Sequence, residues 1–424
     1  MFKTFGQLFK RSNKDLRKRI YFTLFCLAIF ACGTTITVSW ISAAYEEYGF
    51  LEIYNLMAGG GLKSFSIFAL GVSPYITAQI VTNILQMDII PYFKELKEEG
   101  YTGKQKINRI TRYLGILLAF VQGYVFTRAY SGSTDAMLLV KTTVIFTAGT
   151  ALLLWIGDRI TKNGIGNGLS LLIMAGILQS LPKIFTEAFN SLVTSGTFKM
   201  GAGIALFAAF ILVYLLIVVG IIWVQLAERR IPIQYANRTN SAYGGHQNYL
   251  PIKINSAGVI PVIFATMLLG LPGTIASFIE KGKDATPALD FINKYLTNTT
   301  LTGFILYVAL IFFFAYFWTF LEINPEEMSK NFAKNGAYIP GVRPGEATSE
   351  YVGKVLSRLT IVGSIFLIII AALPILFTKF SGLSSSVTIG GTGLLIVVGV
   401  AIETYKQLES SLVSRSHRFG VRRK

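Results

Sequence analysis

The feature that most restricts the fold is a series of about ten apolar segments, each close to the length of a membrane-spanning helix. A helix rises about 1.5 Å per residue, so roughly 20 residues cross the ~30 Å hydrocarbon core. Only 14% of the 424 residues are charged, against about 25% in a typical soluble domain. We therefore predict an all-α polytopic membrane protein with little room for a separate soluble domain. The predicted spans are 20–42, 62–90, 110–130, 138–158, 167–188, 202–226, 255–279, 299–323, 355–378 and 390–410.

The first apolar segment follows a basic start and ends near two alanines, as a cleaved signal peptide does. Its run of about 22 apolar residues is longer than the core of a signal peptide, so we predict a permanent span. Residues 1–19 fit a cytoplasmic amphipathic helix on an anionic membrane surface, or alternatively a solvated basic tail. Three phenylalanines recur there at helical spacing: Phe2, Phe5 and Phe9.

Basic residues concentrate in alternate connections between the spans. Residues 94–112, 227–254, 324–358 and the tail 411–424 are rich in Lys and Arg, whereas the charged residues of 43–56 are all glutamates. Roughly 30 of the 39 Lys and Arg fall on one side. The positive-inside rule therefore predicts that both termini are cytoplasmic. The formal net charge of +17 then indicates orientation and an acidic or RNA-bearing partner on that side, and not DNA binding.

The second span is interrupted. Three glycines open the stretch 57–91, Lys63 lies one turn into its apolar part, and Gly71 and Pro74 break the run. We predict two short helices with a joint near Gly71 to Pro74. A broken helix at membrane depth is tolerated where protein or a water-filled cavity surrounds it, and such spans point to a transport pathway. The alternative is a kinked span with no role in transport.

The residues that would indicate catalysis or cofactor binding are missing. The sequence contains no GxxxxGK[ST] loop for nucleotide phosphates. Cys26 and Cys32 are six residues apart and lie on different helix faces, which argues against a disulfide or metal site. His246 and His417 are far apart in predicted loops. The GIGNG sequence at 164–168 is predicted to start a helix and not to bind a dinucleotide, because no strand precedes it. From these observations together we predict no cofactor, no metal and no enzymatic activity.

The middles of the spans contain almost no ionisable residues. Glu228, Glu322 and Glu403 lie toward the cytoplasmic ends, while Lys63 and Arg128 lie toward the outside. A secondary transporter of small solutes would need a polar cage near the midplane. An intramembrane enzyme would need paired catalytic groups at the same depth. Neither pattern is found, which leaves a path without a binding site for one small ion.

Isoleucines at helical spacing are the remaining distinctive feature of the spans. Positions i and i+4 share a helix face, and most such pairs are packing or lipid contacts. Grouped around one axis, however, they would form an apolar constriction that blocks ions by excluding water. The six isoleucines in question are Ile76, Ile80, Ile173, Ile177, Ile263 and Ile396.

Five longer motifs resemble the SecY/Sec61-alpha family, the pore subunits of the Sec protein-conducting channel. The resemblance covers essentially the whole chain, with the number, order and orientation of spans that the family has. The motifs are GGGLKSFSIFALGVSPYITAQI, GIGNGLSLLIMAGI, INSAGVIPVIFA, GAYIPGVRPGEATSEYVGKVLSRLTIVG and GGTGLLIVV.

This resemblance implies two pseudo-symmetric inverted halves, 20–190 and 191–410, around an hourglass pore in a bacterial plasma membrane. The six isoleucines match the pore-ring positions of the family. The stretch from about Met57 to Leu70 matches the plug that closes the outer side. The plug residues are Gly59, Gly60, Gly61, Lys63, Ser64, Phe65, Ser66, Ile67 and Phe68.

The resemblance also implies a lateral gate and a docking surface. Residues 72–90 and 255–279 match the gate helices, which carry Gln79, Asn83 and Asn255. The long loops 227–254 and 324–354 would dock the SecA ATPase or the ribosome, although solvated connections remain the alternative. Their candidate docking residues are Arg229, Arg230, Arg238 and Arg343.

The implied function is that of a passive, gated pore for unfolded secretory polypeptides. Transmembrane segments of a substrate would leave sideways into lipid, and SecA or the ribosome would supply the driving force. The expected partners are the small SecE and SecG subunits, SecA, the ribosome, polypeptides with signal sequences, and anionic lipids. A six-isoleucine waist suits such substrates, because branched apolar side chains yield to any passing residue and still exclude water.

Overall fold

The computed structural model is predominantly helical. It describes a large part of the chain, and everything below refers to that part. The described residues are 14–38, 55, 58–86, 90–130, 135–194, 200–235, 248–279, 295–296, 300–381 and 385–421.

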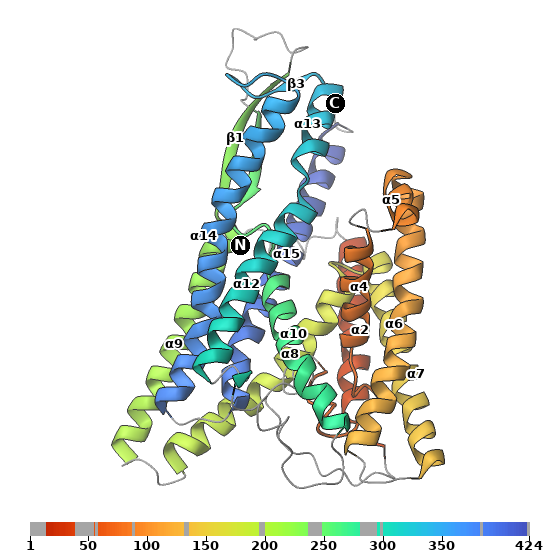
Figure 1. Cartoon of the computed structure of the whole chain (residues 1–424), viewed down its shortest axis with the longest axis vertical. Helices are drawn as coiled ribbons and strands as arrows, with labels where there is room; N and C mark the ends of the chain where they lie inside the picture. Colours follow the sequence, from red (N-terminus) through yellow and green to blue (C-terminus); the bar gives the residue numbers. More distant parts are fainter. Residues whose placement is uncertain are drawn as a thin grey trace.

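The helices fall into two consecutive groups (Figure 1). The N-terminal group consists of α2 (Lys14–Thr35), α4 (Ser73–Leu85), α5 (Pro91–Glu98), α6 (Tyr101–Tyr130), α7 (Ala136–Asn163), α8 (Gly168–Phe189) and the π-helix η2 (Asn190–Thr194). The C-terminal group consists of α9 (Met200–Leu226), α10 (Ile260–Ile279), α12 (Leu301–Glu322), α13 (Pro325–Lys334), α14 (Glu346–Ser381) and α15 (Ser385–Val421).

Each predicted span overlaps a helix of the described chain, although only the second half of 62–90 is helical. Six helical segments there are long and apolar enough to cross a membrane. These are Tyr101–Arg128, Ala136–Asn163, Gly168–Thr194, Met200–Leu226, Leu301–Lys334 and Glu346–Leu373. The 13 residues of α4 reach only about 20 Å, so this helix does not cross the hydrocarbon core alone.

Side-chain caps explain where several helices begin. The Asp135 carboxylate accepts a hydrogen bond from the Met137 backbone N–H (3.1 Å) at the start of α7. At the start of α8, Asn167 caps the backbone N–H of Leu169 (3.2 Å), which confirms that 164–168 is a helix start. Such caps satisfy backbone donors that have no partner within the helix.

The interrupted span differs in part from its prediction. The second half is the helix α4, with Pro74 in its first turn as expected. The first half, however, is a series of turns and not a short helix. Right-handed helix is excluded because the backbone repeatedly adopts positive φ. The residues concerned are Gly59 (67°), Gly60 (83°), Phe65 (46°) and Gly71 (56°).

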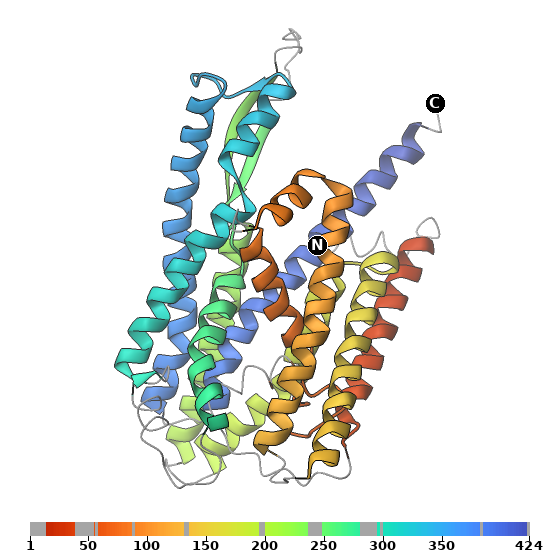
Figure 2. The same ribbon diagram turned by 45° about the vertical axis from the view of Figure 1, so that its right-hand side comes forward.

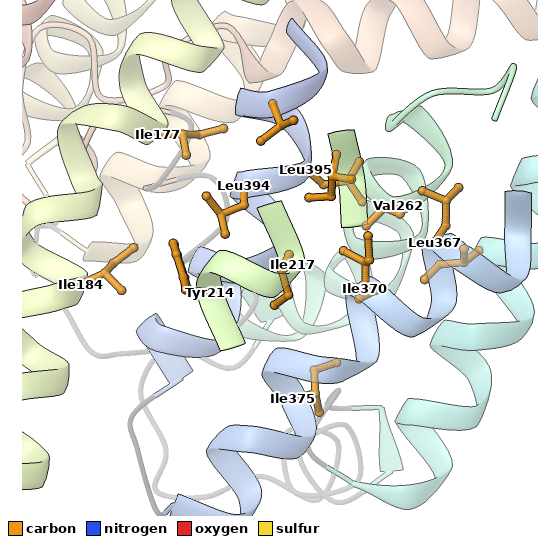
Figure 3. Close-up of a cluster of buried hydrophobic side chains, with 14 of the residues drawn as sticks. Ile177, Ile184, Tyr214, Ile217, Val262, Leu367, Ile370, Ile375, Leu394 and Leu395 are labelled. Atoms are coloured by element: carbon orange, nitrogen blue, oxygen red, sulfur yellow. The ribbon is translucent and has the colours of Figure 1, made fainter. Parts of the chain in front are cut away.

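Two hydrophobic clusters make up most of the membrane core. The N-terminal cluster includes Phe30 of α2, Leu153 of α7 and Leu172 of α8. The C-terminal cluster joins α9, α10, α12, α14 and α15, and it also includes Ile177 and Ile184 of α8. Figure 3 shows these two α8 side chains beside residues of α9 and α15. Helix α8 therefore belongs to the cores of both groups.

A small sheet lies at the same end of the molecule as α5 and α13 (Figure 1). Strand β1 (Glu228–Tyr235) pairs antiparallel with β2 (Asn248–Lys253) and with β3 (Ala337–Tyr338). A separate hydrophobic cluster joins this sheet to α13 and to the first turns of α14. Its buried members are Ile231, Ile252, Ile339, Val352 and Leu356. The described parts of the two long basic loops thus form one folded unit, which we call the cytoplasmic module after the side that the charge distribution predicts for these loops.

Candidate functional site

The predicted plug is a folded segment fixed to the end of α2. An antiparallel bridge joins Thr37 to Ser66. Backbone hydrogen bonds of 2.9 and 3.0 Å lie on either side of Ser66. Just after the segment, the Thr150 hydroxyl of α7 donates to the Gly71 carbonyl at 3.3 Å. The second half of the segment is therefore attached to the residues that follow α2 and, through Gly71, to α7. Met57, where the predicted plug begins, lies outside the described residues.

Aromatic rings hold the middle of the plug. The Phe68 ring stacks on Phe30 of α2, with centroids 6.1 Å apart and planes at 13°. The Phe65 ring lies 6.1 Å from that of Phe146 on α7. Both plug phenylalanines are only 3% exposed, so each contributes roughly 1.5–3 kcal/mol of apolar burial. In contrast, Ser64 is exposed, and Gly59, Gly60 and Lys63 are half-buried.

The helices around the plug present glycines to it. A Cβ added to Gly33 of α2 would overlap the Phe68 ring, and one added to Gly149 of α7 would overlap the Ile67 carbonyl. On the plug itself, a Cβ added to Gly59 would lie 2.9 Å from Gln179 Oε1 of α8. We call these contacts the plug seat. The sequence did not reveal it, because the glycines come from separate helices and only packing brings them together.

The six predicted ring isoleucines divide into three sets. Ile173 of α8 and Ile396 of α15 are half-buried, and each packs against both main clusters, so they lie where the two helix groups meet. Ile177 is fully buried in the C-terminal cluster. Phe68 of the predicted plug and Val72, just before α4, belong to the N-terminal cluster that Ile173 and Ile396 contact. We call Ile173, Ile177 and Ile396, at the place where the two clusters meet, the apolar waist.

The other three isoleucines lie near the predicted gate. Ile80 of α4 packs against a cluster that contains Ala257, Phe264 and Trp318. This contact joins the two helix groups across the seam between α4 and α10. Ile76 and Ile263 are half-buried, and within the described residues they belong to none of the hydrophobic clusters.

The polar residues of the predicted gate have different surroundings. Gln79 is exposed, while Asn83 Oδ1 accepts a hydrogen bond from Gln86 Nε2 at 3.3 Å on the same helix. The buried Asn255 donates from Nδ2 to the Gly258 carbonyl at 2.9 Å. Asn255 therefore stabilises the turn that precedes α10, which is a structural use of a residue predicted to line the gate.

A bidentate ion pair joins α6 to α7 within the N-terminal helix group. Arg112 of α6 and Asp158 of α7 approach to 2.6 and 2.8 Å through two pairs of atoms. We expect Asp158→Ala to lower the free energy of unfolding by about 1–2 kcal/mol, because the pair is only partly buried. Thermal unfolding of the purified protein in detergent measures this.

The matched control for Asp158→Ala is Lys106→Ala, which removes an exposed pair with Glu99. That pair should contribute less than about 1 kcal/mol. An equal decrease in the free energy of unfolding in the two variants would show that the Arg112–Asp158 pair stabilises the protein no more than an exposed pair does. The swap of both charges, Arg112→Asp with Asp158→Arg, should recover part of the loss.

Three of the four candidate docking arginines lie on the cytoplasmic module. Arg229 and Arg230 lie exposed on β1, and Arg230 pairs with Glu228 at 3.1 Å. Arg343 is exposed on the loop between β3 and α14, with its carbonyl accepting from the Thr348 hydroxyl at 2.8 Å. Its side chain is therefore presented on a fixed loop. Arg238 lies outside the described residues.

Together these features define a polytopic helical membrane protein in which two helix groups meet at an apolar waist beside a folded plug segment. The SecY family model matches residues 66–405 of the chain. The chain is 44% identical to the protein translocase subunit SecY of Bacillus subtilis (strain 168), over 99% of both chains. It is 45% identical to that of Staphylococcus epidermidis (strain ATCC 12228 / FDA PCI 1200), over 100% of both. The chain belongs to the SecY family of protein translocase subunits.

Solved structures agree with the fold. The structure of a protein-conducting channel matches with a TM-score of 0.68 at 20% identity, over 95% of this chain and 94% of that one. Sec61 in the canine ribosome–channel complex from the endoplasmic reticulum matches with a TM-score of 0.64 at 20% identity, over the same shares. The predictions of an all-α polytopic membrane fold and of a SecY-family translocase subunit are thus confirmed.

Proposed function

We propose that the waist and the plug together form the closed gate of a polypeptide-conducting pore. The observation that carries the proposal is the position of Ile173 and Ile396, which contact the cores of both helix groups, including the N-terminal core that contains Phe68 of the plug. A seal at this place opens when the groups separate, because its two sides belong to different groups. The pore is passive and has no enzymatic activity of its own.

The two groups act as the halves of the channel, 20–190 and 191–410, in a bacterial plasma membrane with both termini cytoplasmic. The remaining ring positions, Ile76, Ile80 and Ile263, complete the waist from α4 and α10. The seam between these helices is the lateral gate. There the exposed Gln79 and the half-buried Asn83 meet a substrate helix that leaves for the lipid.

A signal sequence supplies the energy that opens the gate. Apolar residues gain about 0.3–0.6 kcal/mol each at the centre of a membrane helix, so ten of them give roughly 3–6 kcal/mol. Shifting a closed gate from 1:99 to 99:1 takes about 5.5 kcal/mol. Insertion at the seam held by Ile80 therefore accounts for much of the opening. A bound partner at the cytoplasmic module supplies the rest.

The proposed partners follow from the family and from charge. SecE and SecG accompany the channel in the membrane, and anionic lipids surround its basic side. SecA or the ribosome binds the cytoplasmic module through Arg229, Arg230, Arg238 and Arg343. The relatives include a Sec61 channel bound to a ribosome, which supports the ribosome as a partner for this chain.

The ring is tested by Ile396→Asn in the complex reconstituted into planar bilayers. A polar side chain wets the waist, so we expect a resting ion conductance about tenfold above the wild type and export of substrates with defective signals. Leu373→Asn, at an exposed position of α14, serves as the control. Wild-type conductance and background export in Ile396→Asn would contradict the proposal.

A further inference from the structure

Helix α15 contacts the N-terminal group along one continuous stripe. The stripe residues are spaced four apart, and residues i and i+4 are neighbours on a helix surface. They begin at the waist and end near the cytoplasmic end of α2. The stripe consists of Ile396, Val400, Thr404, Leu408 and Leu412.

The middle of the stripe packs on α8 and on the turn before it. Val400 is buried in the N-terminal cluster together with Leu171 and Leu172. A Cβ added to Gly166 would lie 3.1 Å from Thr404 Oγ1, so the backbone of the turn passes close to α15. The contact therefore continues from the waist toward the cytoplasm along one i±4 ridge, which winds around the helix by about 40° per step.

The cytoplasmic end of the stripe has its own hydrophobic seat. Leu412 is 6% exposed and forms a cluster with Leu16 and Ile165, against which Leu408 and Ile20 also pack. The position of Ile165 is fixed, because its backbone N–H donates to the Thr23 hydroxyl of α2 at 3.1 Å. We call this cluster the α15 clasp.

The same helix carries Ile396 at the waist. Next to Ile396, Leu394 and Leu395 are buried in the C-terminal cluster, so α15 belongs to that group at one end and to the clasp at the other. Figure 2 shows α15 running diagonally across to the N-terminal group, as expected when i±4 ridges pack. Ile396 and Leu412 are about 24 Å apart on one unbroken helix.

We propose that Leu408 and Leu412 are positioning residues for Ile396. The clasp fixes the angle at which α15 crosses the N-terminal group, and that angle determines how Ile396 meets Ile173 in the waist. When the clasp is released, α15 pivots on its packing around Leu394 and Leu395, and the waist loosens. The inference rests on the proposed function, which assigns Ile396 to the seal.

The test measures resting ion conductance of the full chain with its small membrane subunits in planar bilayers. We expect Leu412→Asn to raise this conductance about tenfold, as a modest shift of the closed state would. The variant Leu412→Met keeps the apolar volume and should have the same resting conductance as the wild type. Ser410→Asn, at an exposed position two residues away, should change nothing.

A double-mutant cycle separates positioning from a general loss of stability. Distant independent sites have additive effects, so independence predicts that Leu412→Asn adds its full effect to that of Ile396→Asn. We expect instead that the double variant conducts no more than Ile396→Asn alone, because both changes act on the same seal. Leu408→Ala, a milder change, gives the same comparison if Leu412→Asn fails to assemble.

The outcomes distinguish the two proposals. Conductance at the wild-type level in Leu412→Asn and in Leu408→Ala, with a leaking Ile396→Asn, would overturn the positioning role and leave the pore proposal standing. Additive effects in the double variant would also overturn it. A tight Ile396→Asn channel would overturn the ring, and the inference from the clasp would fall with it.

Discussion

Replacing Gly149 with valine is expected to make the resting channel conduct ions in the absence of any substrate. The added side chain would occupy the place of the Ile67 carbonyl in the plug. Since a backbone atom has no alternative rotamer, the plug must leave its seat. Overpacking of this kind costs about 1–3 kcal/mol, which lowers the ratio of closed to open channels by about 5- to 150-fold.

The measurement is single-channel conductance, with Gly220→Val as the matched control. Gly220 also lies inside a membrane helix, but a Cβ added there would meet only the Phe366 ring, at 4.0 Å. In a chain that lacks residues 58–70, Gly149→Val should cause no further increase, because its target has been removed. A Gly149→Val channel as tight as the wild type would show that the plug does not close the pore from this seat.

The variant Arg343→Glu is expected to lose most SecA-driven export while the protein still assembles in the membrane. The loop keeps its shape without the side chain, because it is fixed through main-chain atoms such as the Arg343 carbonyl and the Gly345 carbonyl, which accepts from Ser329 Oγ at 2.6 Å. An arginine at the centre of an interface typically contributes about 2 kcal/mol or more, so binding should weaken at least roughly 30-fold.

The control for Arg343→Glu is Lys330→Glu, which makes the same change in charge on the exposed face of α13. A general electrostatic effect would slow association in both variants and weaken as salt is added. A specific contact would appear only in Arg343→Glu and would persist at high salt. Equal export by the two variants would remove Arg343 from the docking site.

The helices could be predicted from the sequence because the bilayer sets their length. Each apolar segment of about 20 residues has no alternative to a helix when its backbone groups lie in lipid. The start of α8 was also readable, since Asn167 is a local cap. The break at Gly71 and Pro74 was predicted correctly, but its first half was assigned to a helix because the segment is apolar.

The seat and the module could not be predicted, because they depend on contacts distant in sequence. Nothing near Gly33 in the sequence indicates that it faces the Phe68 ring. Likewise, Ile231 and Val352 share one cluster although their loops are separated by two membrane helices. The family resemblance places Asn255 on a gate helix, but the hydrogen bond of its amide to the Gly258 carbonyl could not be read from the sequence.

Helix α14 has a mechanical consequence. Val352 and Leu356 near its start are buried in the cytoplasmic module, and Leu367 and Ile370 further along are buried in the C-terminal membrane core. This single helix of 36 residues, about 54 Å long, is therefore anchored both in the cytoplasmic module and in the membrane core. If the proposed motor pushes against Arg343, α14 would transmit the force to the membrane helices directly, because no flexible linker separates the two anchors.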